Sequence, residues 1–228
     1  FVIDPGFYTY FGDLDWHRHF RQEEAHNTVR ILGYRQAEYC GRLKWQKAKV
    51  PQLLEWADRE TAIRCAGQIE YEPGIRHQRD ICYQKERFWV IRDRVETRGF
   101  RMPAETYLHF DPGVDIEVDA DRNVILARQG QRRLFIHFFH PCQVPAFRGG
   151  DGPDRGWVCP GYGMKEPAWR VVVTWTPLLC NQQSAFILLP YQANDPHPPR
   201  VRQEPNAREL TVHCRQERYG VSWEEGLR

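Results

Sequence analysis

The chain has 228 residues, which is long enough to bury a sizeable core without disulfide bonds. It contains 32 Lys and Arg against 30 Asp and Glu, and the formal charge of +2 lacks the basic excess that nucleic-acid binding usually needs. Its apolar runs are a handful of residues long, against the roughly 20 that cross a bilayer, so composition argues against both a nucleic-acid partner and a membrane span.

The chain begins at Phe1, inside the apolar run Phe1-Val2-Ile3, with no initiator methionine or signal segment before it. We therefore expect an N-terminally truncated fragment of a larger protein. The seven cysteines are scattered and include no Cys-x-x-Cys pair, so no zinc ribbon or redox motif is visible. We expect mostly free or partly buried thiols.

Two polar residues stand at the ends of the first apolar runs. Asp4 lies where a strand breaks into a Pro-Gly turn, and His26 lies just before Asn27-Thr28 and the next strand. If those strands are neighbours, the two side chains converge, and an oxygen with an imidazole is a partial ligand set for zinc. Spacing alone favours a plainer interpretation, in which Asp4 caps its turn and His26 binds a carbonyl group.

Between them lies a segment rich in aromatic and cationic side chains, which we interpret as a mixed loop. Aromatic faces beside cations suit sugar rings that carry carboxylates or sulfates, and the candidates for such contacts are Tyr8, Tyr10, Arg18 and Arg21. The alternative is tyrosines packed in a core beside solvated charges. In an extended segment His17 and His19 would point in opposite directions, so that at most one faces a cleft. Glu23 and Glu24 are expected in a solvated loop.

The rest of the chain is dominated by period-two alternation and short apolar runs bounded by Gly, Pro, Asn and Asp, which indicates strands and turns. The segment 53–65 fits either an amphipathic helix or a hairpin turning near 58–60, and its alternation favours the hairpin. Histidine 109, in an aromatic strand, is expected to be a satisfied core residue. The segments 147–155 and 192–206 are expected to be surface loops. The predicted strands are 28–32, 88–93, 106–110, 114–118, 124–127, 133–139, 170–175, 185–189 and 209–213.

This pattern predicts an all-β fold, a large antiparallel two-sheet β-sandwich, with residues 1–228 as a single domain. No internal repeat and no clean domain boundary are visible.

Several segments resemble the C-terminal domain of the heparinase II/III family of polysaccharide lyases. Residues 4–10, Asp-Pro-Gly-Phe-Tyr-Thr-Tyr, are similar to the family's Asp-Pro-Gly-x-x-x-Tyr stretch, and Phe20-Arg21 followed by Ala25-His26-Asn27-Thr28 is similar to its Phe-Arg-x-x-x-Ala-His-Asn-Thr signature. Weaker similarities are His77-x-Arg79, Trp89-Val90-Ile91-x-Asp93, Leu108-His109-Phe110 and the segment from Gly156 to Gly163. In that family the domain is an antiparallel β-sandwich beside an N-terminal α/α toroid.

The resemblance implies a metal site and a reaction. Family members bind zinc with the matching Asp and His and with a second His from an upstream segment absent here, so Asp4 and His26 become two of three protein ligands. The implied reaction is β-elimination at a uronic acid of an acidic polysaccharide, with the catalytic residues upstream of Phe1. The implied partners are that polysaccharide and the toroid of the same parent chain, and the implied location is periplasmic or extracellular.

Two other hypotheses remain open on the sequence. One is a non-catalytic carbohydrate-binding or structural β-sandwich. The other is an unrelated sugar-binding jelly roll, which predicts that Asp4 and His26 lie far apart, whereas a separation within about 5 Å argues against it.

Overall fold

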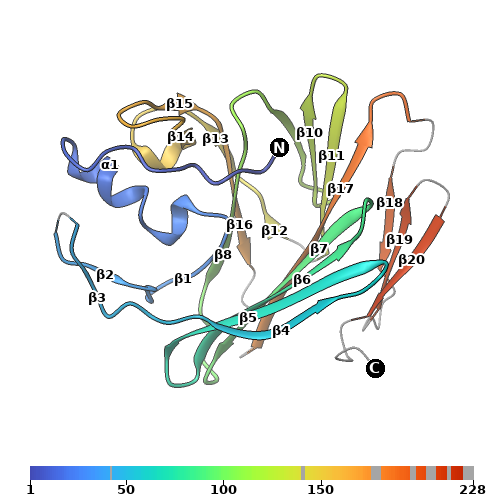
Figure 1. The fold of residues 1–228 in the computed structure, drawn as a ribbon, viewed down its shortest axis with the longest axis horizontal. Helices are drawn as coiled ribbons and strands as arrows, with labels where there is room; N and C mark the ends of the chain where they lie inside the picture. Colours follow the sequence, from blue (N-terminus) through green and yellow to red (C-terminus); the bar gives the residue numbers. More distant parts are fainter. Residues whose placement is uncertain are drawn as a thin grey trace.

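Most of the molecule is antiparallel strand (Figure 1). The computed structural model describes residues 1–41, 43–139, 142–175, 181–195, 199–203, 209–214 and 217–222. Within these ranges the helical elements are α1 (Leu14–His19) and the 3-10 turns η1 (Glu23–Ala25) and η2 (Pro153–Arg155). The predicted all-β antiparallel sandwich is confirmed.

The larger sheet has eight strands in the order β4-β5-β6-β7-β17-β11-β10-β9, and every neighbouring pair is antiparallel. The first two of these strands form a hairpin, which confirms that interpretation of residues 53–65 over the helix. The strand bounds are β4 (Gln52–Asp58), β5 (Ala62–Glu72), β6 (Ile75–Gln84), β7 (Phe88–Thr97), β9 (Asp115–Asp119), β10 (Val124–Gln129), β11 (Arg132–Phe138) and β17 (Asn181–Gln192).

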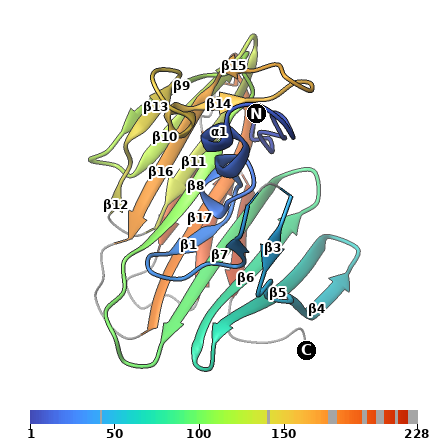
Figure 2. The ribbon, with the colours of Figure 1, turned by 90° about the vertical axis from the view of Figure 1, so that its left-hand side faces the viewer.

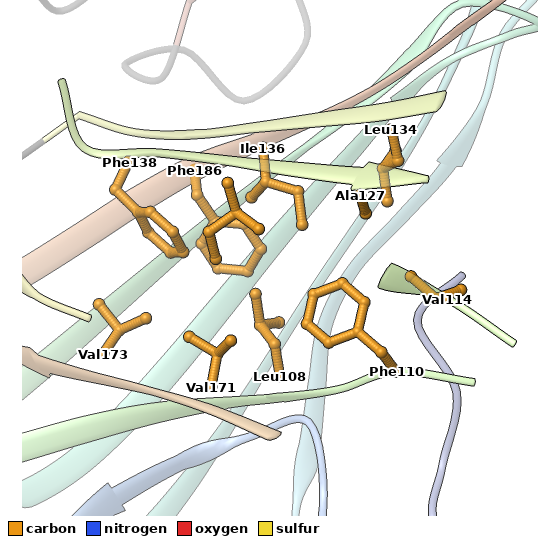
Figure 3. Close-up of a cluster of buried hydrophobic side chains, with 11 residues drawn as sticks. Leu108, Phe110, Val114, Ala127, Leu134, Ile136, Phe138, Val171, Val173 and Phe186 are labelled. Atoms are coloured by element: carbon orange, nitrogen blue, oxygen red, sulfur yellow. The ribbon is translucent and has the colours of Figure 1, made fainter. Parts of the chain in front are cut away.

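The second sheet has five strands and faces one side of the larger sheet. Strands β1, β8, β16 and β12 are neighbours in that order, and β13 also pairs with β16. Alternate apolar side chains of both sheets meet in a closed core, in which Phe110 and Val171 lie opposite Ile136 and Phe186 (Figure 3). The bounds are β1 (Val29–Ile31), β8 (Ala104–His109), β12 (Cys142–Gln143), β13 (Ala146–Arg148) and β16 (Trp169–Trp175).

A small third sheet covers part of the other face of the larger sheet. It consists of β18 (Arg200–Gln203), β19 (Glu209–Cys214) and β20 (Glu217–Ser222), and Val212 packs in a second apolar cluster with Phe88, Val90 and Ile187. The prediction of a surface loop over 192–206 is therefore wrong for β18, because Val201 packs against this cluster. Residues 196–198 and 204–208 of that segment lie outside the described ranges.

Two short hairpins complete the fold. They pair β2 (Glu38–Tyr39) with β3 (Trp45–Gln46), and β14 (Trp157–Val158) with β15 (Glu166–Pro167). The segment predicted as a loop at 147–155 contains η2 but also the end of β13. Figure 1 shows α1 on the side of the molecule away from β18–β20, and Figure 2 shows α1 next to the N-terminus.

Helix α1 corrects the expectation of a mixed loop. The Asp13 carboxylate accepts from the backbone N–H of Asp15 at 2.9 Å and of Trp16 at 3.4 Å, which satisfies two donors that the first helical turn leaves open. His17 and His19 are both buried by the helix. The extended geometry that placed them on opposite sides was therefore wrong.

Four cysteines of the described chain carry free thiols, namely Cys40, Cys65, Cys82 and Cys159, as expected. Among the residues that the structure describes, no helix has the length and apolar character required to cross a membrane.

Candidate metal and ligand site

Strand β8 brings the two ends of the N-terminal region together. Residues 29–31 pair with one part of its edge, and Val2 forms an antiparallel bridge to Phe110 further along, where the Ile3 N–H donates to the His109 carbonyl at 3.0 Å. The gap between these two pairings is filled by Asn27. Its side-chain amide donates to the Ile3 carbonyl and its side-chain oxygen accepts from the His109 N–H, each at 2.8 Å.

Asp4 follows the bridge made by Val2, and His26 precedes the pairing made by residues 29–31, so the two side chains meet. His26 Nδ1 and Asp4 Oδ2 are 2.6 Å apart. The other carboxylate oxygen of Asp4 accepts from the Gly6 N–H at 2.9 Å, so Asp4 also caps its turn. Asp4 therefore both caps its turn and converges with His26, and His26 contacts this carboxylate where the plainer interpretation expected a carbonyl group. The close approach argues against the unrelated jelly roll.

The pair suits zinc in donor type but provides two ligands. The side chains of His26 and Asp4 are 38% and 60% exposed, so both can turn toward a shared ion. Two donors on one tetrahedral zinc lie about 3.3 Å apart, which needs only a small opening of the present contact. Within the described ranges, no group of three or more His, Cys, Asp or Glu side chains is placed to hold a metal. Metal binding by Asp4 and His26 stays a prediction.

A pocket of about 370 Å³ opens beside His26. The guanidinium of Arg21 lies 5.6 Å from the ring centroids of both Phe7 and Trp45, so two aromatic rings hold a cation at the pocket wall. The side chains of Gln22, Thr28 and Gln36 add neutral hydrogen-bonding groups to the pocket lining. The pocket is lined by Arg21, Gln22, Glu23, His26, Thr28, Gln36, Ala37 and Trp45.

The wall of this pocket is built on an ion-pair cluster that sequence reasoning missed. Arg35 Nη1 lies 2.9 Å from a Glu23 oxygen and 2.5 Å from a Glu24 oxygen, and Glu23 also accepts from the Gln36 N–H. Burial alone would raise the pKa of Glu24, but the hydrogen bond and charge of Arg35 outweigh it and lower that pKa. The expected solvated loop at Glu23 and Glu24 is wrong, because η1 turns both carboxylates inward.

The four predicted ligand contacts are not gathered in one place. Arg21 lines the pocket, whereas Arg18 pairs with the exposed Asp15 at 3.4 Å. The ring of Tyr8 lies 5.8 Å from that of Trp16, and the ring of Tyr10 stacks on Tyr162 at 6.0 Å. Contact of these residues with a substrate stays a prediction, and Arg21 has the best geometry for it.

Two buried histidines lie at the ends of their elements: His19 is the last residue of α1, and His109 is the last residue of β8. Burial and the charge of Arg170 lower the pKa of His19 to about 4. His109 is buried as expected, and the same two causes hold its pKa well below the ordinary value. The Glu24 carbonyl lies near enough to raise that pKa slightly, yet neither ring nitrogen of His109 makes a hydrogen bond of normal geometry within the described structure. His109 is therefore a core residue, as expected, and the Glu24 carbonyl is a polar group close to its ring.

A second ion-pair group joins two of the weakly matched motifs. Asp93 is fully buried on β7, and its carboxylate accepts from His77 Nε2 at 2.7 Å and from Arg79 Nε and Nη2 at 2.7 and 2.9 Å. Burial alone would raise the pKa of Asp93, but Arg79 and His77 lower it to about 2. The carboxylate is therefore ionised at neutral pH.

Comparison with known proteins gave a consistent result. A family model described as "Heparinase II/III-like, C-terminal" matches residues 1–207. A search of curated proteins found no match. The solved structure of a heparinase III gene product superposes with a TM-score of 0.77 at 13% identity, over 97% of this chain and 34% of that one. A heparan sulfate lyase from Pedobacter heparinus gives a TM-score of 0.71 at 15% identity, over 96% of this chain and 34% of the other.

Proposed function

Since the chain belongs to the heparinase II/III-like C-terminal family, we propose that it is the β-sandwich domain of a polysaccharide lyase that cleaves a uronic-acid-containing polysaccharide by β-elimination. The chain spans about a third of the length of the solved structures that it matches. The proposed parent chain therefore supplies a further N-terminal domain, an α/α toroid, and acts in the periplasm or outside the cell, where such polymers occur.

The observation that carries this proposal is the contact of Asp4 with His26 beside an Arg21-lined pocket. β-Elimination requires a base for the C5 proton, a group that neutralises the adjacent carboxylate, and an acid for the leaving oxygen. The described residues offer a cation at a pocket wall but no arranged base and acid. We therefore assign this domain one wall of the cleft and place the catalytic groups in the other domain.

Asp4 and His26 would supply two ligands of a zinc ion, and the third protein ligand would come from the parent chain. A zinc ion held there would cross-link the N-terminal segment to the strand that follows His26, which is a structural role. It would also fix the pocket wall, because His26 lines the pocket.

Arg21 is the side chain that we assign to the substrate. Its guanidinium offers paired N–H donors, which match a carboxylate or sulfate in a bidentate geometry. Phe7 and Trp45 hold it in place and keep part of it away from water. Tyr8, Tyr10 and Arg18 would contact more distant sugars of the same chain.

The test uses the full-length protein and a panel of acidic polysaccharides that includes heparin, heparan sulfate and alginate. Cleavage by β-elimination produces an unsaturated uronate whose absorbance rises with time, and metal analysis measures bound zinc. We expect product with at least one polymer, and a loss of about 100-fold in kcat/KM for Arg21→Gln. The matched control is Arg128→Gln, since Arg128 makes an exposed pair with Glu117 on the larger sheet.

Product from none of the polymers contradicts the lyase proposal. Retained binding without product would favour the non-catalytic carbohydrate-binding module. An Arg21→Gln variant as active as the Arg128→Gln variant would remove Arg21 from the substrate site.

A further inference from the structure

The Asp93 ion-pair group is connected to the Asp4–His26 pair through one residue, Arg79. Its Nε and Nη2 bind the buried carboxylate of Asp93, and its Nη1 donates to the backbone carbonyl of Asn27 at 2.5 Å. Arg79 lies on β6 and Asp93 lies opposite it on β7. The guanidinium thus bridges the larger sheet to the segment immediately after His26.

Asn27 connects Arg79 to both Asp4 and His26. Its backbone follows His26, and its side-chain amide holds the carbonyl of Ile3, which precedes Asp4. Its side-chain oxygen fixes the same amide to β8 through the His109 N–H. The backbone carbonyl, the side-chain NH₂ group and the side-chain oxygen of Asn27 are therefore all hydrogen-bonded, and together they set the position of Asp4 relative to His26.

We propose that Arg79, anchored by Asp93 and His77, is a positioning residue that sets the separation and orientation of Asp4 and His26. The inference rests on the proposed function in so far as the pair binds zinc. Lysine cannot replace arginine here, because one ammonium group cannot reach both carboxylate oxygens of Asp93 and the Asn27 carbonyl in the same plane. The site then has a rigid support of the kind that fixes metal ligands elsewhere.

The same two strands provide a matched control. Asp80 and Arg92 form the next pair in the register of β6 with β7, with Arg92 Nη2 at 2.8 Å and Nε at 3.0 Å from Asp80 Oδ2. Successive residues of a strand point to opposite faces, so this ion pair lies on the side of the sheet away from Asn27. Its arginine is 13% exposed against 21% for Arg79.

The experiment compares Arg79→Lys with Arg92→Lys in the full-length protein. Zinc affinity is measured by competition with a chelating indicator, the absorption spectrum of bound Co²⁺ reports the ligand geometry, and thermal unfolding reports stability. We expect both variants to fold with lowered stability. Arg79→Lys should bind zinc 10- to 100-fold more weakly, with an altered Co²⁺ spectrum, while Arg92→Lys stays within about twofold of the unaltered protein.

The inference would be overturned if neither folded variant lost zinc affinity. It would also be overturned if both lost the same amount, since that would indicate a general effect of stability. If Arg79→Lys does not fold, Asn27→Asp replaces it, because the new carboxylate keeps the bond to the His109 N–H and loses the donor to Ile3. The same weakening of zinc binding is expected there.

Absence of zinc from the unaltered protein would contradict the metal proposal and leave the positioning role to be decided by crystal structures. Those structures would retain the 2.6 Å contact between His26 Nδ1 and Asp4 Oδ2 in Arg92→Lys and lose it in Arg79→Lys. A retained contact in both variants would overturn the inference.

Discussion

Gly6 lies directly against the backbone carbonyl oxygen of Cys159, and a Cβ atom built on Gly6 would be 2.8 Å from that oxygen. The Cys159 N–H donates to the Pro5 carbonyl at 2.7 Å, so the two segments are held together by a backbone hydrogen bond. Gly6 also has a φ of +77°, in the region that favours glycine. The Asp-Pro-Gly turn that carries Asp4 therefore requires glycine for two independent reasons.

We predict that Gly6→Ala lowers the free energy of unfolding by roughly 2–3 kcal/mol, because the methyl group displaces one segment from the other. The measurement is urea unfolding. Gly130→Ala is the control, since Gly130 has a φ of +58° with no atom within 4 Å of its built Cβ and should lose about 1 kcal/mol. An equal loss of unfolding free energy in the two variants would show that the segment at Cys159 moves aside without a measurable cost.

Removal of Arg35 should destabilise the fold strongly. Arg35→Met removes the cation that binds the carboxylates of Glu23 and Glu24, which are 6% and 12% exposed, and leaves Glu24 with Arg30 at 3.6 Å. We expect a loss of about 3–5 kcal/mol in the free energy of unfolding at pH 7, measured with urea. The loss should shrink at lower pH, where the carboxylates of the variant take up protons.

The control for Arg35 is an exposed pair of the same type. Arg128 and Glu117 have side chains that are 51% and 61% exposed. Arg128→Met removes the partner of Glu117 and should change the free energy of unfolding by less than about 1 kcal/mol. A comparable change in the two variants would mean that water reaches Glu23 and Glu24 as easily as it reaches Glu117.

The buried histidines predict a stability that falls in mild acid. His19 has a folded-state pKa of about 4, because burial and Arg170 disfavour its charged form, against 6.5 in the unfolded chain. The unfolded chain binds the proton first, so this contribution is complete above pH 6.5 and is lost as the pH falls toward 4. At pH 5 the stability lost in this way amounts to about 2 kcal/mol.

The measurement is the free energy of unfolding from pH 5 to pH 7 for the unaltered protein and for His19→Gln. Replacement of His19 should reduce the slope between pH 5 and 6 by nearly one proton, or roughly 1.3 kcal/mol per pH unit. Asp93 does not interfere, since its lowered pKa of about 2 affects stability only below about pH 4. An unchanged slope would show that His19 titrates normally in the folded protein.

The sequence predicts the central strands and misses parts whose side chains are polar. Residues 170–175 are a short, mostly apolar run, and four consecutive residues of it are buried because β16 lies inside its sheet between β8 and β12. Strand β6 was not predicted, since Gln78 and Asp80 stand where an apolar pattern is expected. Helix α1 is six residues long and depends on the Asp13 cap, and such a short helix has no measurable periodicity.

The candidate site shows the same division. The meeting of Asp4 and His26 could be predicted from the resemblance of their two segments to the family motifs, because spacing alone favours separate roles for two residues that are 22 positions apart. The buried pairing of Asp93 with Arg79 could not, because an ionised aspartate in the interior depends on its partners across two strands rather than on local pattern. The motif similarity marked both residues without a role, and the structure brings them together.

Lys165 links the β14–β15 hairpin to α1 through cation–π contacts. Its Nζ lies 3.4 Å from the ring centroid of Trp16 and 5.2 Å from that of Trp157. Lys165→Gln should lower stability by about 1 kcal/mol and shift tryptophan emission, because the cation–π contact is lost. Lys47→Gln, at an exposed pair with Glu38, should change neither quantity measurably. Unaltered emission in Lys165→Gln would mean that the lysine does not rest on these rings in solution.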